Sequence, residues 1–393
     1  GAGIFLRTAA GDSEDTRRNV DAYLSGTFTL FGREHDLTVG GQWADSEGTT
    51  NTIALRYPTD WARCGTERCY YIPDIRAWDG DISEVTYSRT GARRVAKTTQ
   101  SGVYVATRLR LADPLSLIAG ARLSRWETLS RSYNAAGAYT GTSGAYKVSD
   151  EVTPYVGLVY DITPNVSAYA SYTEIFNPQN FKDRNENLLA PVQGSNLEAG
   201  IKTQWLDGRL TANAAVFEAK QDNYAVRDMG VPEGSLSDGT SAYIGVNGTK
   251  ARGWEMDVNG EILPGWTVNA GYTHVKVTRA ATDLLYANPP KDLLQLNTQL
   301  QLRGALERLS VGGGVQWQSK VQGYNIAYPL GGTVTVNQPA YSLVQFNANY
   351  RISDSWTATL SVRNALDKTY WANLDYNNFG EPRFVSASLR WKF

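Results

Sequence analysis

The sequence predicts an all-β protein, a transmembrane antiparallel β-barrel with about sixteen strands in this chain. Three observations predict this fold class. Polar and apolar residues alternate over long segments, short turns and long connections follow one another strictly, and no stretch approaches the ~18 apolar residues of a membrane-spanning helix. The mean hydropathy of −0.37 agrees, because strands with every second residue facing water average out as hydrophilic.

Alternation with a period of two is clear in the segments 293–303, 341–352, 355–365 and 385–393. In the first segment, one face carries Leu294, Leu296, Leu300 and Leu302, and the other carries Gln295, Asn297, Gln299, Gln301 and Arg303. The segments are about 10–14 residues long, whereas strands of soluble sandwiches are usually about 5–6 residues long. Strands of this length, without helical segments between them, are typical of a barrel whose tilted strands cross a membrane.

Short turns alternate with long connections along the chain. The short turns use Gly, Pro and Asp and are expected near residues 31–34, 112–114, 161–164, 206–208, 263–265, 304–307 and 353–354. The long connections are polar and rich in aromatic residues and are expected near residues 46–93, 130–150, 177–192, 227–246, 279–290, 322–340 and 366–381. Outer-membrane barrels have short periplasmic turns and long outer loops, so the C-terminus is expected on the periplasmic side.

The composition excludes several classes of function. The 38 Lys and Arg residues nearly balance the 39 Asp and Glu residues, whereas a nucleic-acid binder needs a basic face. Only two of the 393 residues are histidines, so neither a His-rich metal site nor a His-based active site is expected. At roughly 150 residues per domain, a chain of this length would form two or three soluble domains, but the long strands favour one barrel.

The two cysteines lie close together in the segment Cys64–Cys69, CGTERC. This spacing suits a small loop disulfide in an oxidising compartment. A free dithiol is the alternative, whereas a zinc site would need more ligands nearby.

Four motifs resemble those of TonB-dependent outer-membrane receptors. VRNALDKTY at 362–370 is similar to the penultimate-strand motif of this family, and FGEPR at 379–383, followed by a strand ending in Phe393, is similar to its last strand. KARGWEMD at 250–257 resembles the family's Arg-Gly-x-Glu strand. YASYTEIFNPQ at 169–179, continued by LEAGIK at 197–202, resembles the ferric-siderophore branch that takes up hydroxamate-type ligands, such as the coprogen and pyoverdine receptors.

The resemblance implies a receptor and transporter for a ferric siderophore, with the hydroxamate type favoured, in the bacterial outer membrane. In this family a signal sequence, a TonB-contacting box and a globular plug precede a barrel of twenty-two strands. The chain opens on residues that are typical of the middle of a strand, Gly1–Leu6. Residues 1–393 are therefore expected to be the C-terminal part of a single transmembrane β-barrel domain, with about sixteen of the presumed twenty-two strands and without plug or signal peptide.

The resemblance also implies the partners. The TonB–ExbB–ExbD complex would energise transport through an N-terminal region that is missing from this chain. The Fe(III) is carried by the siderophore, so the protein is expected to have no cofactor and no metal site of its own. Lipid and lipopolysaccharide of the outer membrane are expected to surround the barrel, and no nucleic acid is expected to bind.

Candidate ligand-binding residues lie at strand ends and in the long connections. A bulky, polar iron chelate needs a concave aromatic surface with a few polar groups, and an arginine can face an anionic chelate. The candidates are Trp61, Tyr71, Phe176, Gln179, Tyr224, Arg227, Tyr243, Tyr324, Trp371 and Tyr376. For each of them, packing within a loop or at the membrane interface is the alternative.

Two other classes of function stay open. A sixteen-stranded diffusion porin would suit this length, although porins lack the motifs quoted above. An outer-membrane enzyme would need a placed histidine, but His35 is expected in a short turn and His274 on the lipid-facing side of a strand. Neither has a nucleophile in register, so no catalytic residue is predicted and the chain is predicted not to be an enzyme.

Overall fold

The computed structural model describes residues 4–64, 67–278, 289–321, 325–327, 333–335, 337–374 and 378–393. These residues are mostly in strands, and the helical structure among them is the short 3-10 turn η1 (Gly304–Leu306). No helix of the described residues is long and apolar enough to cross a membrane. The all-β prediction is confirmed.

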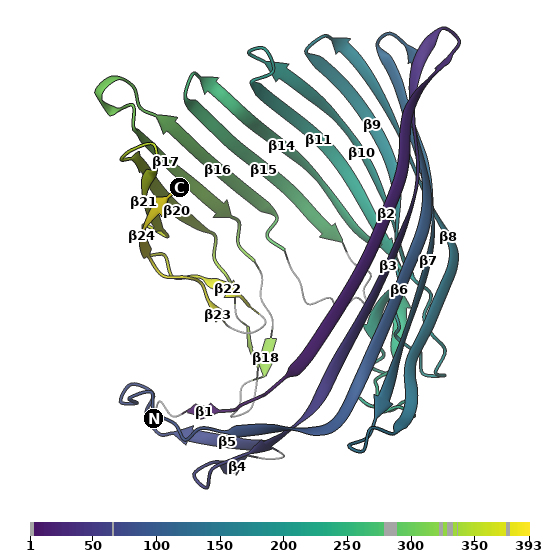
Figure 1. Cartoon of the computed structure of the whole chain (residues 1–393), viewed down its shortest axis with the longest axis vertical. Coiled ribbons are helices and arrows are strands. Elements are labelled where there is room, and N and C mark those ends of the chain that lie inside the picture. Colours follow the sequence, from purple (N-terminus) through teal and green to yellow (C-terminus); the bar gives the residue numbers. More distant parts are fainter. Residues whose placement is uncertain are drawn as a thin grey trace. The chain divides into compact units, whose positions relative to one another are not determined.

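One sheet of fifteen strands dominates the structure, and its strand order can be followed by the labels in Figure 1. In that order the strands are β2 (Asp12–Leu30), β3 (Arg33–Arg56), β6 (Thr86–Ala112), β7 (Leu115–Tyr133), β8 (Tyr139–Thr163), β9 (Val166–Asn177), β10 (Val192–Trp205), β11 (Leu210–Asp222), β14 (Thr249–Leu263), β15 (Trp266–Thr278), β16 (Asp292–Gln301), β17 (Leu309–Gln318), β20 (Tyr341–Arg351), β21 (Trp356–Arg363) and β24 (Phe384–Trp391). From β8 to β24 each strand is antiparallel to the next.

The remaining strands are short and form small separate sheets within the long connections. They are β1 (Ile4–Leu6), β4 (Ala62–Cys64) and β5 (Glu67–Ile72) in one sheet, and the pairs β12 (Tyr224–Arg227) with β13 (Tyr243–Val246), β18 (Asn325–Ala327) with β19 (Thr333–Thr335), and β22 (Trp371–Asn373) with β23 (Asn378–Phe379). The first residues were expected to lie in the middle of a strand, and Ile4–Leu6 does form a short strand, which pairs with β5. Among the described residues the main sheet has fifteen strands, close to the sixteen or so expected.

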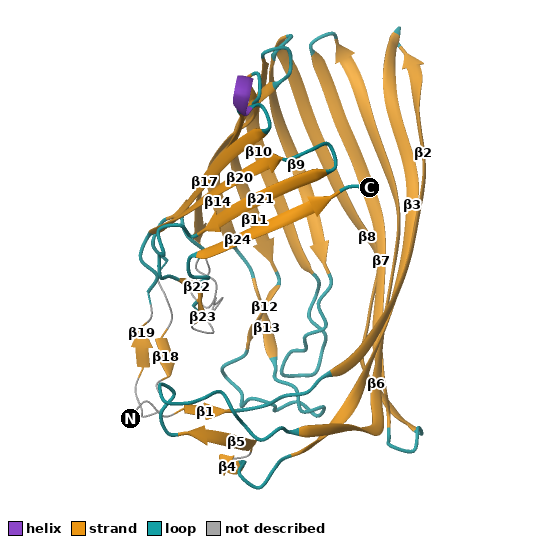
Figure 2. Cartoon of the chain, turned by 60° about the vertical axis from the view of Figure 1, so that its left-hand side comes forward, coloured by secondary structure: helices purple, strands orange, loops and turns teal. Residues whose placement is uncertain are grey.

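All seven expected short turns join consecutive strands of the main sheet. Phe31 and Gly32 both have positive φ, 51° and 74°, as a two-residue hairpin turn between twisted strands requires. Leu206, Asp207 and Gly208 also have positive φ. Along the strands β9 to β24, η1 and the short turns lie at one end, and β12, β13, β22 and β23 lie at the other (Figure 2).

Two expected long connections are wrong in extent. β3 continues to Arg56 and β6 begins at Thr86, so the connection expected at 46–93 is shorter at both ends. β7 and β8 leave only residues 134–138 between them, where residues 130–150 were expected to form a loop. The extra strand residues are polar, for example YTGTSGAY at the start of β8. Backbone hydrogen bonds extend these strands, and such bonds leave no hydrophobic pattern in the sequence.

The chain divides into two compact units. The first comprises Gly1–Ser25, Thr38–Val105 and Arg122–Val152, and the second comprises Gly26–Leu37, Ala106–Ala121 and Thr153–Phe393. The first unit contains the small sheet of β1, β4 and β5, and the second contains β9 to β24. That all 393 residues belong to a single barrel domain stays a prediction.

In the second unit, alternate residues lie on opposite faces of the main sheet. One face, which we call the apolar face, carries a row across β10, β11, β14, β15 and β16 made of Ile201, Ala214, Met256, Tyr272 and Leu294. One residue along each strand, the other face carries Lys202, Asn213, Asp257, Gly271 and Gln295. We call this the polar face. The register therefore confirms the expected separation of apolar and polar residues.

Gly314 of β17 lets polar side chains of the neighbouring strands meet on the polar face. Gly314 lies between Asn297 of β16 and Gln345 of β20, and the Gln345 amide donates to Asn297 Oδ1 over 2.9 Å. A Cβ atom at Gly314 would lie 2.8 Å from Gln345 Nε2 and closer still to Asn297 Oδ1. Glycine is therefore the residue that leaves room for this contact.

Candidate ligand-binding site

Two long connections of the second unit, residues 178–191 and 223–248, pack together and are called the loop pair below. The Tyr243 backbone N–H donates to the Lys182 carbonyl oxygen over 2.8 Å, and the ring of Tyr243 lies 4.4 Å from that of Phe181. Within the second connection, β12 and β13 form a short antiparallel ladder. The loop pair therefore has a defined conformation at the long-connection end of the strands.

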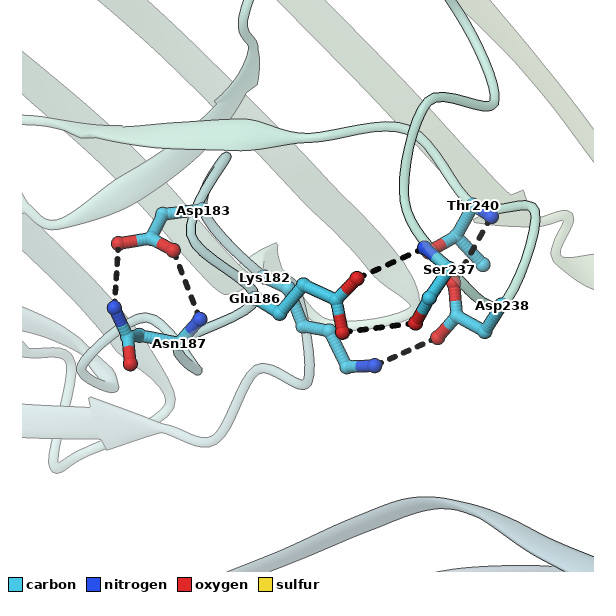
Figure 3. A network of polar contacts seen from close by, with 7 residues as sticks. All are labelled: Lys182, Asp183, Glu186, Asn187, Ser237, Asp238 and Thr240. Atoms are coloured by element: carbon cyan, nitrogen blue, oxygen red, sulfur yellow. Dashed lines mark hydrogen bonds and ion pairs between the residues drawn. The ribbon is translucent and has the colours of Figure 1, made fainter.

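A polar network joins the two connections of the loop pair (Figure 3). Lys182 Nζ lies 2.7 Å from an oxygen of Asp238, and the Glu186 carboxylate accepts hydrogen bonds from the Ser237 amide and hydroxyl, each of 2.9 Å. The ion pair with Lys182 lowers the pKa of Asp238, with a further contribution from Thr240, and the same pair raises the pKa of Lys182. The two Ser237 hydrogen bonds lower the pKa of Glu186. All three groups are therefore charged at neutral pH.

Asp183 folds the tip of the first connection onto itself. Its carboxylate accepts hydrogen bonds from the backbone N–H groups of Asn185 and Asn187 over 2.9 and 2.8 Å, as in an Asx turn. The turn places Glu186 at φ 64°, a conformation that L-residues rarely adopt. The hydrogen bonds from Ser237 to Glu186 help to hold this conformation.

Arg184 forms a second ion pair across the loop pair. Arg184 Nη2 lies 2.6 Å from an oxygen of Asp228, whose side chain is almost completely buried. Asp228 also accepts a hydrogen bond from the Gly230 amide, and this bond and Arg184 lower the pKa of Asp228. A buried carboxylate that keeps its charge needs such partners, so the contact is structural.

Four predicted ligand residues lie in the loop pair, namely Gln179, Tyr224, Arg227 and Tyr243. Gln179 is buried, and its amide nitrogen donates to the carbonyl oxygens of Ala190 and Asn223 over 2.5 and 2.6 Å. The Gln179 side chain therefore fastens the loop pair and has little surface to offer a ligand. Tyr224, Arg227 and Tyr243 are partly exposed on β12 and β13. Arg227 Nη1 lies 3.6 Å from Glu233, while its Nε is buried without a hydrogen-bond partner among the described residues.

Phe176, a further predicted ligand residue, lies near the end of β9. It is an even number of residues from Tyr172 along a continuous ladder, so the two side chains share the apolar face. Tyr169, on the opposite face, donates a hydrogen bond to Glu198. Phe176 therefore lies on the face opposite to Tyr169 and Glu198.

A polar cavity of about 250 Å³ lies on the polar face where β16, β17, β20 and β21 approach the long connections. Its side chains include Gln295, Asn297, Gln345, Arg363, Tyr370 and Glu381. Arg363 Nη2 lies 2.8 Å from Glu381, and its guanidinium carbon lies 4.8 Å above the ring of Phe384. The cavity therefore combines amides, one ion pair and an aromatic hydroxyl.

Trp371 lies next to this cavity along the chain. Its ring stacks on Phe379 at 4.1 Å, and its backbone N–H donates to the Gln338 side-chain oxygen over 2.6 Å. The neighbouring Tyr370 stacks on Tyr341 at 4.7 Å and lines the cavity. The role of Trp371 in ligand binding stays a prediction, and the sequence analysis did not name the cavity residues Arg363, Tyr370 and Glu381. Arg363 and Gln345 occupy polar positions of the alternating pattern near the long-connection ends of β21 and β20. This position in the pattern could have identified them as candidates.

In the first unit, Trp61 and Tyr71 belong to the small sheet and the residues around it. Trp61 is only 1% exposed, its indole N–H donates to the Ser83 carbonyl oxygen, and its ring packs between Tyr57 and Tyr70 at 5.5 and 5.8 Å. Trp61 is therefore a core residue of this loop rather than an open ligand surface. Tyr71 is 51% exposed and packs against Phe5.

Cys64 and Cys69 form a disulfide between β4 and β5, with their Cα atoms 5.9 Å apart. The pair is thus oxidised in this structure, in agreement with the loop disulfide suggested by its spacing. The predicted ligand residues Tyr324 and Tyr376 lie outside the described residues.

The histidines occupy structural positions. His35 is buried beside the short turn after β2, where Nε2 lies 3.1 Å from the Leu30 carbonyl oxygen and Nδ1 accepts from the Arg110 amide over 3.0 Å. His274 lies on the apolar face, 2.7 Å from Asp292. Among the described residues, no group of three or more His, Cys, Asp and Glu side chains is arranged to hold a metal ion. The polar and aromatic side chains of the loop pair and the cavity are suited to noncovalent contacts with a polar ligand.

The family model described as TonB dependent receptor-like, beta-barrel matches residues 2–365. The chain is 34% identical over 388 residues to the ferripyoverdine receptor of Pseudomonas aeruginosa, with 97% of this chain and 45% of that protein covered. It is 26% identical over 258 residues to the ferrioxamine B receptor of Salmonella typhimurium, with 62% of this chain and 34% of that protein covered.

Solved structures of outer-membrane receptors superpose on this chain. The crystal structure of the outer-membrane ferripyoverdine receptor of Pseudomonas aeruginosa bound to ferripyoverdine superposes with a TM-score of 0.82 at 34% identity, covering 97% of this chain and 49% of that one. The ferric-catecholate import receptor Fiu of Escherichia coli shares the fold, with a TM-score of 0.75 at 22% identity. The chain spans about half the length of these relatives.

Proposed function

We propose that this chain, which belongs to the family of TonB-dependent receptor β-barrels of the outer membrane, takes part in the uptake of a ferric siderophore. Two of its relatives are named for ferripyoverdine and ferrioxamine B. We favour a hydroxamate-type ligand, because the segment 169–179 resembles receptors of that class. The Fe(III) would arrive in the ligand, so the protein would need no metal site of its own.

The polar cavity carries this proposal. Arg363, Tyr370 and Gln345 provide a cation, a hydroxyl and an amide on one concave surface, and an anionic, oxygen-rich iron chelate needs such groups. The loop pair adds Tyr224, Arg227 and Tyr243 at the same end of the strands. In this proposal the long connections face the outside of the cell and the C-terminus faces the periplasm.

Energy would come from the TonB–ExbB–ExbD complex, acting through a region outside residues 1–393. This part of the proposal rests on what is typical of the family. A diffusion porin is not favoured, because the matching family model and the relatives are those of receptors. These relatives are transport receptors rather than enzymes.

Ligand binding by the full-length protein tests the proposal. Ferric hydroxamate and ferric catecholate siderophores are titrated into the detergent-solubilised protein, and quenching of the tryptophan fluorescence is measured. We expect saturable binding of at least one ferric hydroxamate, weaker binding of the same siderophore without iron, and growth on that ferric siderophore as iron source. Failure of every ferric siderophore to bind contradicts the proposed function, and tight binding of catecholates alone contradicts the hydroxamate assignment.

A further inference from the structure

Four basic side chains gather at the loop end of the apolar face in β11, β14 and β15. The register places Lys220 opposite Lys250, and Arg252 opposite Lys276, in two neighbouring rows. We call Lys220, Lys250, Arg252 and Lys276 the cation group. Glu218, which lies opposite Arg252, contacts Arg252 and Lys220. One carboxylate thus serves two of the four cations.

The other two cations have no such partner in the described part of the chain. No described carboxylate lies within ion-pair distance of Lys250 or Lys276. Lys276 is exposed, and the side chain of Arg252 is 64% exposed. An unmatched positive surface attracts an anion, and phosphate is the anion that lysine and arginine bind well.

A shallow apolar groove of about 500 Å³ begins next to the cation group. Its apolar side chains include Ala199, Ile201, Ala214, Val216, Trp254 and Met256. Ala199 and Ala214 leave a depression between the larger side chains, so we call it the alanine groove. Val216, Met256 and Ile201 are 59%, 48% and 47% exposed, and such a surface is suited to an acyl chain.

The position of the cations matches the boundary of a membrane. Nine residues separate Trp254 from Leu263 at the short-turn end of β14, which corresponds to roughly 30 Å along the strand and, at the usual barrel tilt, to about the 25 Å height of an apolar band. The ring of Trp254 stacks on Tyr272 at 5.0 Å, and Trp and Tyr are enriched at membrane interfaces. Arg252 and Lys276 lie one row beyond Trp254, which is the level of lipid headgroups.

We propose that the cation group and the alanine groove together bind a phosphorylated lipid of the outer leaflet. The phosphate lies against Lys250, Arg252 and Lys276, and one acyl chain lies along the groove. The proposal rests on the orientation proposed above, which places the long-connection end of the strands at the outer leaflet. A lipid fits better than a water-soluble partner, because the groove lies on the face that meets the hydrocarbon of the membrane.

The test uses the full-length protein in a nonionic detergent, with diphosphorylated lipid A as the probe and native mass spectrometry as the measurement of binding. We expect lipid A to bind, and the same lipid to lose most of its affinity once its phosphates are removed. The double variant Lys250→Gln/Lys276→Gln leaves the contacts of Glu218 intact and is expected to weaken binding about tenfold or more. Filling the groove by Ala214→Leu is expected to weaken binding as well.

A matched control removes the same charge elsewhere. Arg351 and Lys392 lie at the short-turn end of the strands, so Arg351→Gln/Lys392→Gln is expected to bind lipid A as the unsubstituted protein does. Equal binding by the lysine double variant overturns the site, and so does equal binding of the dephosphorylated lipid. A preference for phosphatidylglycerol at equal phosphate concentration overturns the outer-leaflet assignment. Siderophore titrations on the same samples test the proposed function separately, because the cation group lies outside the proposed siderophore site.

Discussion

The Lys182 ammonium lies 2.7 Å from the Asp238 carboxylate, although the two residues are 56 positions apart in the chain. This contact joins the two connections of the loop pair. The two side chains are 24% and 32% exposed, so water screens the pair only in part. The hydrogen bonds of Glu186 with Ser237 lie beside it (Figure 3). Together these contacts keep the loop pair assembled at the end of the strands.

Breaking this ion pair is expected to loosen the loop pair. Lys182→Met and Asp238→Asn should each increase the rate at which proteinase K cleaves the loop pair, residues 178–191 and 223–248, and the double variant should add little to either single variant. The coupling free energy in such a cycle is expected to be at most about 1 kcal/mol for a partly exposed pair. Lys392→Met, at the other end of the strands, is the control and should leave the cleavage rate unchanged. Fully additive effects of the two substitutions would contradict the contact.

The loop pair is expected to be equally protected across a wide range of pH. The pKa of Asp238 is lowered from 3.8, so its contribution is complete above that value and is lost as the pH falls through the lower folded pKa. The pKa of Lys182 is raised from 10.5, so its contribution is complete below that value and is lost as the pH rises through the folded pKa.

Hydrogen exchange of residues 178–191, corrected for the intrinsic exchange rate, measures this protection. The protection factors should be the same between about pH 4 and pH 10 and should fall outside that range. In Asp238→Asn, the protection factors should fall less as the pH drops below about 4, because Asp238 no longer titrates. A fall of protection between pH 5 and pH 8 in the unsubstituted protein would show that another group controls the loop pair.

Gly314→Ala is expected to destabilise the sheet. The added Cβ atom would collide with the Gln345 and Asn297 amides, and overpacking of this kind costs about 1–3 kcal/mol. Gly271→Ala is the matched control in β15, because nothing lies within 4 Å of its added Cβ atom. Thermal unfolding in detergent should show a lower Tm for Gly314→Ala and little change for Gly271→Ala. Equal Tm values for the two variants would count against the role assigned to Gly314.

Arg363→Gln is expected to weaken siderophore binding, provided that the polar cavity holds the ligand. Removing the cation should raise the Kd for an anionic ferric chelate about tenfold, while Tm changes little because the Arg363–Glu381 pair is about half exposed. Tryptophan quenching measures the Kd. Arg351→Gln is the control, because Arg351 lies at the short-turn end of β20, away from the cavity. An unchanged Kd for Arg363→Gln would exclude the cavity as the charge-recognising site.

The disulfide predicts the reactivity of the cysteines. Under native conditions an alkylating reagent should label neither Cys64 nor Cys69, and both should be labelled after addition of a reductant, as measured by mass spectrometry. Because the bridge closes a short loop beside the core residue Trp61, reduction should also change the fluorescence of the protein. Labelling without a reductant would support the free dithiol instead.

Much of the fold could be predicted, because alternation is a local property of the chain. The pattern around Leu294 and Gln295 assigned each residue to its face, and Gly, Pro and Asp marked the expected short turns. The length of β8 could not be predicted, because its first residues are polar and pair through backbone hydrogen bonds. The partner of the opening strand Ile4–Leu6 is β5, and the sequence did not predict this pairing.

The ligand-binding residues themselves stay a prediction. Of those named from the sequence, Tyr224 and Tyr243 lie on the paired strands β12 and β13. Residue type did not distinguish a ligand contact from a packing contact. Trp61 and Gln179 are both buried, and each satisfies its polar hydrogens with backbone carbonyl groups.

The sequence by itself determined the alternation of the strands, the positions of the seven expected short turns and the resemblance to a receptor family, since each depends on neighbouring residues. The tertiary structure alone decided which distant residues meet. Arg363 meets Glu381, Lys182 meets Asp238, and Lys220 lies opposite Lys250, through strand register and loop packing. Those contacts depend on the closing of long loops and on backbone pairing, and neither leaves a periodic signal in the chain.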